Sequence, residues 1–306
     1  MDEIFDVIII GAGAAGLTAG IYTSRAKLST VILNEGAIGG QIVLTEEIAN
    51  YPGVESTKGY MLANIMKKQA KSFGCKLKSN VKIIKYSFDK EIKVVELEDG
   101  RIFQGRSVIL TPGGRPRSLN IHGENKFKGT GISYCATCDG DFFTGKEVVV
   151  VGGGNSALEE AVALTTFATK VTVVHQFDHF QAFEHAIQEA EKNPKVEIIM
   201  ESELRGFYGN ENLEKVTIEH LPTGKISEYK TDGTFIFVGY QPNTESFAKH
   251  INLNERKEII VDTDMKTNIK GVFAAGDCIV KKYRQVTTAV ADGTIAALSV
   301  SEFLRS

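Results

Sequence analysis

The chain has 306 residues, of which 42% are hydrophobic and 24% are charged, with a formal net charge of −3. This length is about twice the roughly 150 residues of a common domain, so we expect two domains. The composition excludes disordered, collagen-like and disulfide-dense chains, and the balance of 35 basic and 38 acidic residues argues against a nucleic-acid partner.

The N-terminus gives no sign of export or membrane insertion. It begins Met1-Asp2-Glu3 and lacks the basic segment of a signal peptide. The longest stretch of low polarity, residues 7–21, contains glycines and is shorter than the ~20 apolar residues that span a bilayer. The four cysteines do not form the pattern of a secreted, stapled fold. We therefore expect a cytoplasmic protein with no membrane partner.

The first predicted strand leads into a glycine-rich turn. Residues 6–10 form a short apolar run typical of a buried parallel strand, and GAGAAG follows at 11–16. We expect a helix over residues 14–26 and a second strand over 29–33 that ends near Glu35. Such glycines let the backbone and the helix N-terminus approach a pyrophosphate, while the acid has the spacing needed for a ribose hydroxyl. The pattern predicts a dinucleotide site.

The same pattern recurs in the second half of the chain. A predicted strand at 146–151 is followed by GGGNSA at 152–157 and by a helix through about residue 166. Two such turns indicate two dinucleotide sites, or one active site and one that has lost its function. A third element, residues 271–277, is a short strand that ends in Gly-Asp, where the acid either binds a sugar-alcohol hydroxyl or closes an ordinary turn.

One cysteine pair has functional spacing: Cys135 and Cys138 in the sequence CATCD. Two sulfurs at this spacing can close a small ring, and a helix N-terminus or a cation lowers the pKa of one thiol. Asp139 is a candidate proton donor or acceptor for the departing sulfur. Zinc needs about four ligands, which the sequence does not supply, so we expect no metal site. For Cys75 and Cys278, packing in the core is the better interpretation.

The whole chain resembles the low-molecular-weight thioredoxin reductases. The motifs that carry the resemblance, in the order of that family, are GAGAAG, GGQ at 39–41, CATCDG, GGGNSALEEA at 152–161, GYQPNT at 239–244, AAGDC and YRQVTTA. The large pyridine-nucleotide disulfide reductases instead carry their cysteines after the first glycine motif, where this chain has GGQ followed by Ile-Val-Leu.

The resemblance implies an α/β fold of two Rossmann-like, three-layer dinucleotide-binding domains, the second inserted into the first. Residues 1–114 and 245–306 would form the FAD-binding domain, and residues 115–244 a nucleotide-binding-type domain that carries the CxxC. Family members are homodimers whose domains rotate between a flavin-reducing and a flavin-oxidising arrangement.

The resemblance also implies which residues bind FAD. The glycines of the first motif and Glu35 would hold the ADP half, whereas Gln41, Asn50, Asp277 and Gln285 would lie around the ribityl chain and the flavin. The full implied set is Gly11, Gly13, Ala14, Ala15, Gly16, Glu35, Gly40, Gln41, Asn50, Val81, Gly276, Asp277, Arg284, Gln285 and Val286.

By the scheme of the family, electrons pass from the reduced flavin to the disulfide through Cys138. Cys135 then attacks the disulfide of thioredoxin, and Asp139 handles the proton. We therefore predict an FAD-dependent disulfide oxidoreductase that reduces thioredoxin or a similar small redox protein. Two alternatives stay open: a reductase for another acceptor, such as a peroxidase system, and a flavin-binding redox sensor with little turnover.

The second dinucleotide site departs from the family pattern. NADPH-using members carry HRRxxxR after the second strand of this domain, but the chain has HQFDHFQ at 175–181, so all three arginine positions are uncharged. Because charge-assisted contacts are worth about 1.5–3 kcal/mol each, losing two weakens NADPH binding on the order of a hundredfold. NADPH is therefore disfavoured.

Three electron donors remain open. NADH suits the glycine turn, and Gln176 could bind a ribose hydroxyl, although no acid stands directly at the strand end. If the second nucleotide site is vestigial, reduced ferredoxin or another carrier would be the electron donor. NADPH could still bind through lysine side chains that the sequence does not place. The residues predicted for this second site are Gly152, Gly154, Asn155, Ser156, Ala157, His175 and Gln176.

Three further features have competing interpretations. His175 and His179 are four residues apart and could share a helix face, but without a carboxylate partner they do not predict a metal site. The run 281–284, Lys-Lys-Tyr-Arg, is typical of a solvated loop and could also meet an acidic protein partner. In LTPGG at 110–114 the proline removes one backbone donor that could otherwise contact FAD.

Overall fold

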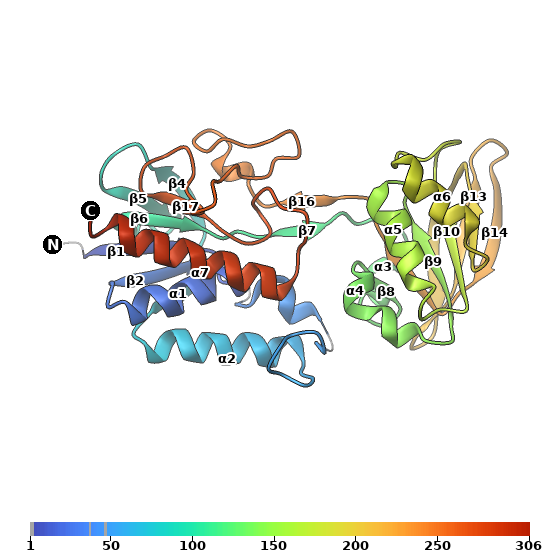
Figure 1. Ribbon diagram of the computed structural model, residues 1–306, viewed down its shortest axis with the longest axis horizontal. Coiled ribbons are helices and arrows are strands. Elements are labelled where there is room, and N and C mark those ends of the chain that lie inside the picture. Colours follow the sequence, from blue (N-terminus) through green and yellow to red (C-terminus); the bar gives the residue numbers. More distant parts are fainter. Residues whose placement is uncertain (1–2, 37, 46–47) are drawn as a thin grey trace. The chain divides into compact units, whose positions relative to one another are not determined.

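The computed structural model describes residues 3–36, 38–45 and 48–306, so Met1 and Asp2, on which the expectation about export depends in part, lie outside the described residues. The chain divides into two compact units, Met1–Arg115 with Gln241–Ser306, and Pro116–Tyr240 (Figure 1). It passes from one unit to the other through β7 (Gly114–Pro116) and β16 (Tyr240–Pro242), which pair as a two-stranded sheet.

Unit 1 contains a seven-stranded sheet in the order β3-β2-β1-β6-β5-β4, and β17 also pairs with β6. Strands β1, β2, β3, β6 and β17 run parallel, whereas β5 pairs with β6 in antiparallel fashion and β4 pairs with β5 in the same way. The parallel register places Ile10 beside Leu33 and Leu110, so three strands end at one edge. The bounds are β1 (Ile4–Ile10), β2 (Thr30–Asn34), β3 (Lys76–Ser79), β4 (Ile83–Ser87), β5 (Lys93–Leu97), β6 (Ile102–Leu110) and β17 (Val272–Ala274).

The helices of unit 1 cover this sheet. Helix α1 packs against α7, and Gly293 makes the approach possible, because a Cβ there would lie 2.3 Å from the carbonyl oxygen of Ala15. Ten of the twelve residues of α1 are buried, which explains its run of small and apolar side chains. The bounds are α1 (Ala14–Arg25), η1 (Gly40–Leu44), α2 (Gly59–Ser72), η3 (Glu245–Phe247) and α7 (Val286–Phe303).

Unit 2 has three layers. A parallel sheet, β11-β10-β9-β15-β8, lies between the helices and a three-stranded antiparallel sheet, β12-β13-β14. In β9 (Glu147–Val151), Val148 and Val150 belong to the helix-side core and Val149 and Val151 to the opposite core. Because both faces of this strand are covered, it is a continuous apolar run. Figure 1 shows α5 and β14 on opposite sides of β9.

The helix that the sequence predicts in unit 2 is present. The helix predicted after the second glycine turn is α5 (Asn155–Leu164), and the charged segment 184–192 is α6. The other bounds are α3 (Glu124–Phe127), β8 (Ile132–Ser133), α4 (Ala136–Asp139), η2 (Gly140–Phe143), β10 (Lys170–Val174), α6 (Glu184–Lys192), β11 (Val196–Ile199), β12 (Ser202–Gly209), β13 (Leu213–His220), β14 (Lys225–Lys230) and β15 (Gly233–Ile236).

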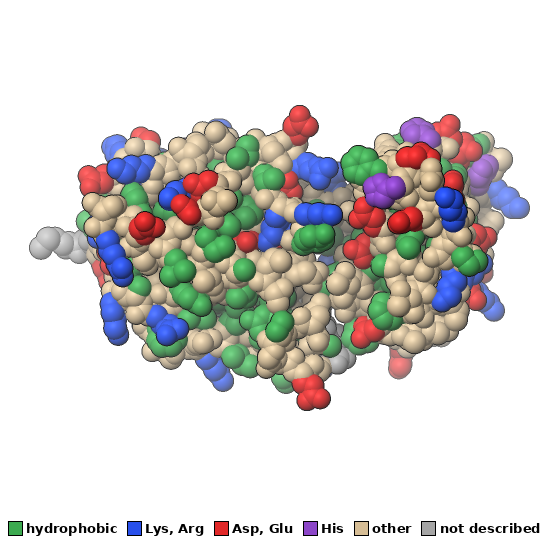
Figure 2. All heavy atoms as spheres, in the orientation of Figure 1, with side chains coloured by type: hydrophobic (Ala, Val, Ile, Leu, Met, Phe, Trp, Pro, Cys, Tyr) green, Lys and Arg blue, Asp and Glu red, His purple; other side chains and the backbone are tan. Residues whose placement is uncertain are grey.

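This architecture confirms the predicted α/β class with two dinucleotide-binding-type sheets. None of the helices in the described ranges is long and apolar enough to cross a membrane. Lysine and arginine side chains are interspersed with acidic ones over the face drawn in Figure 2.

Candidate functional site

The first glycine turn is built by close backbone packing. Gly11 has a φ of +107°, and a Cβ there would lie 2.2 Å from the carbonyl oxygen of Thr111 at the end of β6. A Cβ on Gly16 would lie 2.0 Å from the carbonyl oxygen of Gly11. A Cβ on Gly13, in contrast, would have no described atom within 4 Å. Two glycines are thus required by the fold, and the third leaves open space beside the helix.

The N-terminus of α1 suits an anion. The helix begins after Gly13 without a side-chain cap, and its first turn, which includes Ala14 and Ala15, holds no acidic residue. The N–H groups of a first helical turn have no partner within the helix, so they and the helix dipole favour a phosphate. The side chain of Asn34 supports the turn by accepting a hydrogen bond from the N–H of Ala12 at 2.9 Å.

The predicted ribose ligand lies just beyond the end of β2. Glu35 is exposed, and its Oε1 accepts a hydrogen bond from the N–H of Ile83 at 3.0 Å. Val81 is buried, and its N–H donates to the carbonyl of Asn34. Gly40 has a φ of +61°, and a Cβ there would lie 3.3 Å from the Cα of Gly13, whereas Gln41 is exposed in η1. The structure therefore gathers these residues around the first turn.

Asp277 supplies a buried acceptor between β17 and α7. Its Oδ1 is buried and has no hydrogen-bond partner among the described residues. Burial is the main cause that raises the pKa of this carboxyl, while the cations of Lys281 and Arg284 oppose the rise. A buried acceptor without a donor is costly, so this oxygen fits a hydroxyl donor such as a sugar-alcohol chain.

The neighbours of Asp277 in the predicted set lie on the same segment. Gln285 caps α7 through a capping box with Thr288, and its Oε1 accepts a hydrogen bond from the side chain of Asn50 at 3.3 Å. Gly276 has a φ of +85°, and Val286 is the first residue of α7. The unit-1 residues expected to hold FAD therefore combine an anion-binding helix terminus with a buried hydroxyl acceptor, and they fit the cofactor.

The interpretation of residues 281–284 as a solvated loop is only partly right. Lys282 and Tyr283 are exposed, but the side chain of Lys281 is 12% exposed and that of Arg284 22%. Each of the latter two forms an ion pair inside unit 1, with Asp292 and Glu258 respectively.

Unit 2 carries the redox-active pair. Cys135 and Cys138 form a disulfide with a Cα–Cα distance of 5.3 Å, within the usual range for such bonds. Cys135 is the N-cap of α4, and its carbonyl accepts hydrogen bonds from the N–H groups of Cys138 and Asp139. Both cysteines are half-buried.

Asp139 is held beside the disulfide by a serine that the sequence analysis missed. The hydroxyl of Ser133 donates to Oδ2 of Asp139 at 2.6 Å and accepts a hydrogen bond from the N–H of Cys135 at 3.1 Å. Burial raises the pKa of Asp139, the Ser133 hydrogen bond opposes this, and the charge of Asp141 adds to the rise. A carboxyl with a raised pKa is suited to general acid work.

The other two cysteines are structural, as predicted. Cys75 is 5% exposed and Cys278 is fully buried. Burial raises the pKa of Cys75 to about 11 and that of Cys278 to about 12. Thiols with such pKa values carry almost no thiolate at neutral pH and are poor nucleophiles.

The second glycine turn is covered by the loop that follows β10. The N–H of Gln181 donates to the carbonyl of Gly153 at 2.8 Å, and the N–H of Phe183 donates to Oδ1 of Asn155 at 2.6 Å. Gly152 has a φ of +135° and would, with a Cβ, lie 2.5 Å from the carbonyl oxygen of Phe237. α5 begins after Gly154 without a side-chain cap; Ser156 is exposed and Ala157 buried.

The idea that His175 and His179 share a helix face is wrong, because both lie in this loop. The ring of His175 is buried and lies against Gly153, where a Cβ would come within 2.4 Å of the imidazole. Its Nε2 is 3.0 Å from the carbonyl oxygen of His179. Burial is the main cause that lowers the pKa of His175, while its hydrogen bond with the backbone of His179 opposes this. Gln176 is exposed at the start of the loop.

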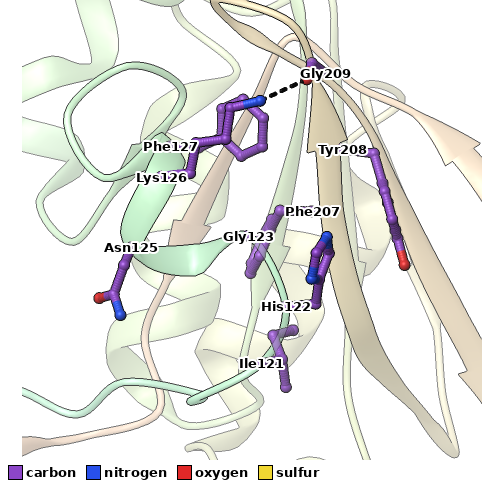
Figure 3. Close-up of a pocket in the computed structure, with 9 residues that line it drawn as sticks. All are labelled: Ile121, His122, Gly123, Asn125, Lys126, Phe127, Phe207, Tyr208 and Gly209. Carbon is purple, nitrogen blue, oxygen red and sulfur yellow. Dashed lines mark hydrogen bonds between the residues drawn. The ribbon is translucent and has the colours of Figure 1, made fainter.

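A separate cavity of about 310 Å³ in unit 2 contains none of the predicted residues. Figure 3 shows His122 beside Tyr208, with ring centroids 5.2 Å apart, and Lys126 reaching the carbonyl of Gly209 at 2.9 Å. Lys126 is thus engaged with the backbone, and the ring of His122 packs on that of Tyr208. Among the described residues there is also no cluster of side chains that could hold a metal ion.

The sequence profile of the family described as pyridine nucleotide-disulphide oxidoreductase matches residues 5–293. The chain is 44% identical over 305 residues to the thioredoxin reductase of Bacillus subtilis, covering 99% of this chain and 96% of that protein. It is 46% identical over 305 residues to a protein of Clostridium pasteurianum described as the 34.2 kDa protein in rubredoxin operon, covering 99% and 98%. The thioredoxin reductase structure from Streptococcus pyogenes aligns with a TM-score of 0.94 at 38% identity, covering 100% and 99%.

The chain therefore belongs to the pyridine nucleotide-disulphide oxidoreductase family. It is a flavin-dependent oxidoreductase, and the predicted resemblance to the low-molecular-weight thioredoxin reductases is confirmed over the whole length.

Proposed function

We propose that this enzyme reduces the disulfide of thioredoxin, or of a similar small redox protein, through the dithiol form of Cys135 and Cys138. The observation that carries this proposal is the Cys135–Cys138 disulfide, in a chain 44% identical to a thioredoxin reductase. FAD, when bound, supplies the electron pair that reduces this disulfide. Asp277 would hold its polyol and the N-terminus of α1 its pyrophosphate.

The protein chemistry is two successive thiol–disulfide exchanges. The thiolate of Cys135 attacks one sulfur of the acceptor disulfide, forms a mixed disulfide and displaces the other acceptor sulfur as a thiolate. The thiolate of Cys138 then attacks Cys135, restores the Cys135–Cys138 bond and releases the second acceptor sulfur. The acceptor gains two electrons and two protons, and the enzyme dithiol loses them.

Asp139 moves the protons in this scheme. The hydroxyl of Ser133 fixes the carboxyl at the first turn of α4, next to the cysteines. Because its pKa is raised, the carboxyl keeps its proton to a higher pH than an exposed aspartate and can protonate a leaving thiolate.

This role gives a pH prediction. We expect the rate of acceptor reduction by the reduced enzyme to fall as pH rises through the raised pKa of Asp139. The Asp139→Asn variant should lack this fall in rate. Below the pKa of Asp139, where the native carboxyl is protonated, the variant should be about a hundredfold slower than the native enzyme. Stopped-flow measurement of thiol release at different pH values tests this. The control is Asp141→Asn, which removes a charge that raises the pKa of Asp139. In this variant the fall in rate should occur at lower pH. An unchanged profile for Asp139→Asn would exclude the role.

For the electron donor we propose NADH, with reduced ferredoxin as the alternative. The loop over the second glycine turn carries Gln176, Phe177 and Gln181, and no lysine or arginine occurs between Lys170 and Lys192. This segment therefore offers no positively charged side chain to the 2′-phosphate of NADPH. The N-terminus of α5 still suits the pyrophosphate that NADH and NADPH share.

Anaerobic titration of the FAD-loaded enzyme with NADH, NADPH and reduced ferredoxin, followed by oxidised thioredoxin, tests donor and acceptor together. We expect NADH to bleach the flavin and thioredoxin to restore its colour. The triple variant Gln176→Arg, Phe177→Arg and Gln181→Arg should bind NADPH about a hundredfold or more tightly than the native enzyme, with little change in NADH affinity. Bleaching of the native enzyme by low-micromolar NADPH, or by ferredoxin alone, would overturn the proposed donor.

The proposal includes a homodimer in the cytoplasm. Support for the dimer comes from exposed apolar side chains on α2 and α7, such as Ile65 and Leu298, both 57% exposed, which a second copy could bury. Support for a reducing compartment comes from Cys75 and Cys278, which are free thiols.

A further inference from the structure

The segment that joins β17 to α7 carries two cations, Lys281 and Arg284, and each forms an ion pair with little exposure. The Lys281–Asp292 pair has side chains 12% and 13% exposed, and the Arg284–Glu258 pair 22% and 8%. A surface pair such as Lys266–Asp264 is 48% and 53% exposed. Exposed pairs contribute little to stability, whereas buried charges need well-arranged partners. We therefore ask what the two pairs with little exposure hold in place.

Both pairs are tied to the backbone around Asp277. The Oδ2 atom of Asp292 accepts the N–H of Gly276 at 3.2 Å as well as the ammonium of Lys281. On the other side, Nε of Arg284 donates to the carbonyl of Asp277 at 3.3 Å, while its guanidinium pairs with Glu258. The backbone is thus fixed at two neighbouring points, by Asp292 at the N–H of Gly276 and by Arg284 at the carbonyl of Asp277.

Glu258 is itself held in place, so this anchor is rigid. It is 6% exposed, and its Oε2 accepts a hydrogen bond from the side chain of Asn254 at 2.7 Å. On the opposite side, the turn abuts α1, because a Cβ on Gly276 would lie 2.9 Å from the Cβ of Ala15. The turn therefore packs directly on the helix that begins at the first glycine motif.

The group that this arrangement presents is the Asp277 carboxylate. Its Oδ1 is buried and has no partner among the described residues, although two cations and two anions surround the segment. The four charges are paired with each other, so they fix the position of Asp277 and leave its acceptor for another donor.

We propose that Asp292 is a positioning residue for the cofactor: with Lys281 it holds the Gly276–Asp277 turn so that the Asp277 carboxylate meets the hydroxyl groups of the FAD ribityl chain. This inference rests on the proposed function, since it takes FAD as the ligand of unit 1. Asp292 touches neither the cofactor nor the acceptor in this scheme, and it acts through the turn.

The test compares FAD affinity with the stability of the deflavinated protein. In Asp292→Asn the amide can still accept the N–H of Gly276, but the charge that holds Lys281 is lost. We expect the dissociation constant of FAD, from fluorescence titration, to rise about tenfold or more. The exposed-pair control Asp264→Asn should change it less than about twofold.

A second variant protects the test against misfolding. Lys281→Met with Asp292→Asn removes both charges of this pair, so neither partner stays buried without the other and the deflavinated protein should melt close to the native temperature. Its FAD affinity should nevertheless stay about tenfold lower. Lys281→Arg, which keeps the charge, should bind FAD within about twofold of the native protein.

Two results would overturn the inference: native FAD affinity in the double variant, or a loss of thermal stability in the deflavinated double variant that parallels the loss of affinity. Failure of the proposed function looks different: without FAD as the cofactor the native protein itself would bind no stoichiometric FAD, and without disulfide reduction it would bind FAD normally but fail to reduce thioredoxin.

Discussion

Replacing either Cys135 or Cys138 with serine is expected to lower the rate of thioredoxin reduction by about a thousandfold or more, while the protein stays folded and binds FAD. The hydroxyl of serine cannot form the disulfide through which the electron pair passes. Both positions lie at the one-turn helix α4 and are half-buried, so the substitution disturbs no large packed surface.

The matched control is Cys75→Ala, which removes a buried thiol with a raised pKa and should leave the specific activity within about twofold. The assay follows thiols formed in thioredoxin after anaerobic reduction of each variant. Native activity in Cys135→Ser or Cys138→Ser would contradict the proposed dithiol, and it would favour direct transfer to another acceptor.

An added methyl group should lower the stability of the protein at Gly16 but the affinity for FAD at Gly13. In Gly16→Ala the new Cβ would lie 2.0 Å from the carbonyl oxygen of Gly11 and 2.6 Å from Oγ1 of Thr111. Overpacking of this kind costs about 1–3 kcal/mol or more, so the deflavinated protein should lose stability. In Gly13→Ala the methyl group meets no described atom within 4 Å, and the stability should change by less than about 1 kcal/mol.

FAD affinity should nevertheless fall in Gly13→Ala, by about tenfold or more, because the methyl group enters the space where backbone and pyrophosphate meet. Thermal melting of the deflavinated protein and fluorescence titration with FAD separate the two effects. If Gly13→Ala bound FAD as tightly as the native chain, the pyrophosphate would not lie at this turn.

Local sequence patterns predicted the elements well where one segment determines its own structure. The helix expected over residues 14–26 is α1 (Ala14–Arg25), and the strand expected at 146–151 is β9 (Glu147–Val151). Glycines with a required conformation, such as Gly11 and Gly152, were visible because their spacing repeats between the two units. The spacing of Cys135 and Cys138 showed that their sulfurs could close a small ring, and the structure contains this bond.

Contacts between distant residues could not be predicted in the same way. Nothing around Asp292 in the sequence indicates that it lies beside Gly276, and Lys281 looked like part of a solvated run. Ser133 gained its importance only from its contacts with Cys135 and Asp139. The spacing of His175 and His179 suggested a shared helix face, but the segment is a loop in which the His175 ring packs on Gly153, a contact between distant residues.

The most direct test of the central claim is the number of electrons that the FAD-loaded protein takes up in an anaerobic dithionite titration. If the Cys135–Cys138 disulfide exchanges electrons with the cofactor, the native protein should take up roughly four electrons per chain, two for the cofactor and two for the disulfide. Cys138→Ser should take up roughly two. Equal uptake by the two proteins would mean that no electrons reach this disulfide.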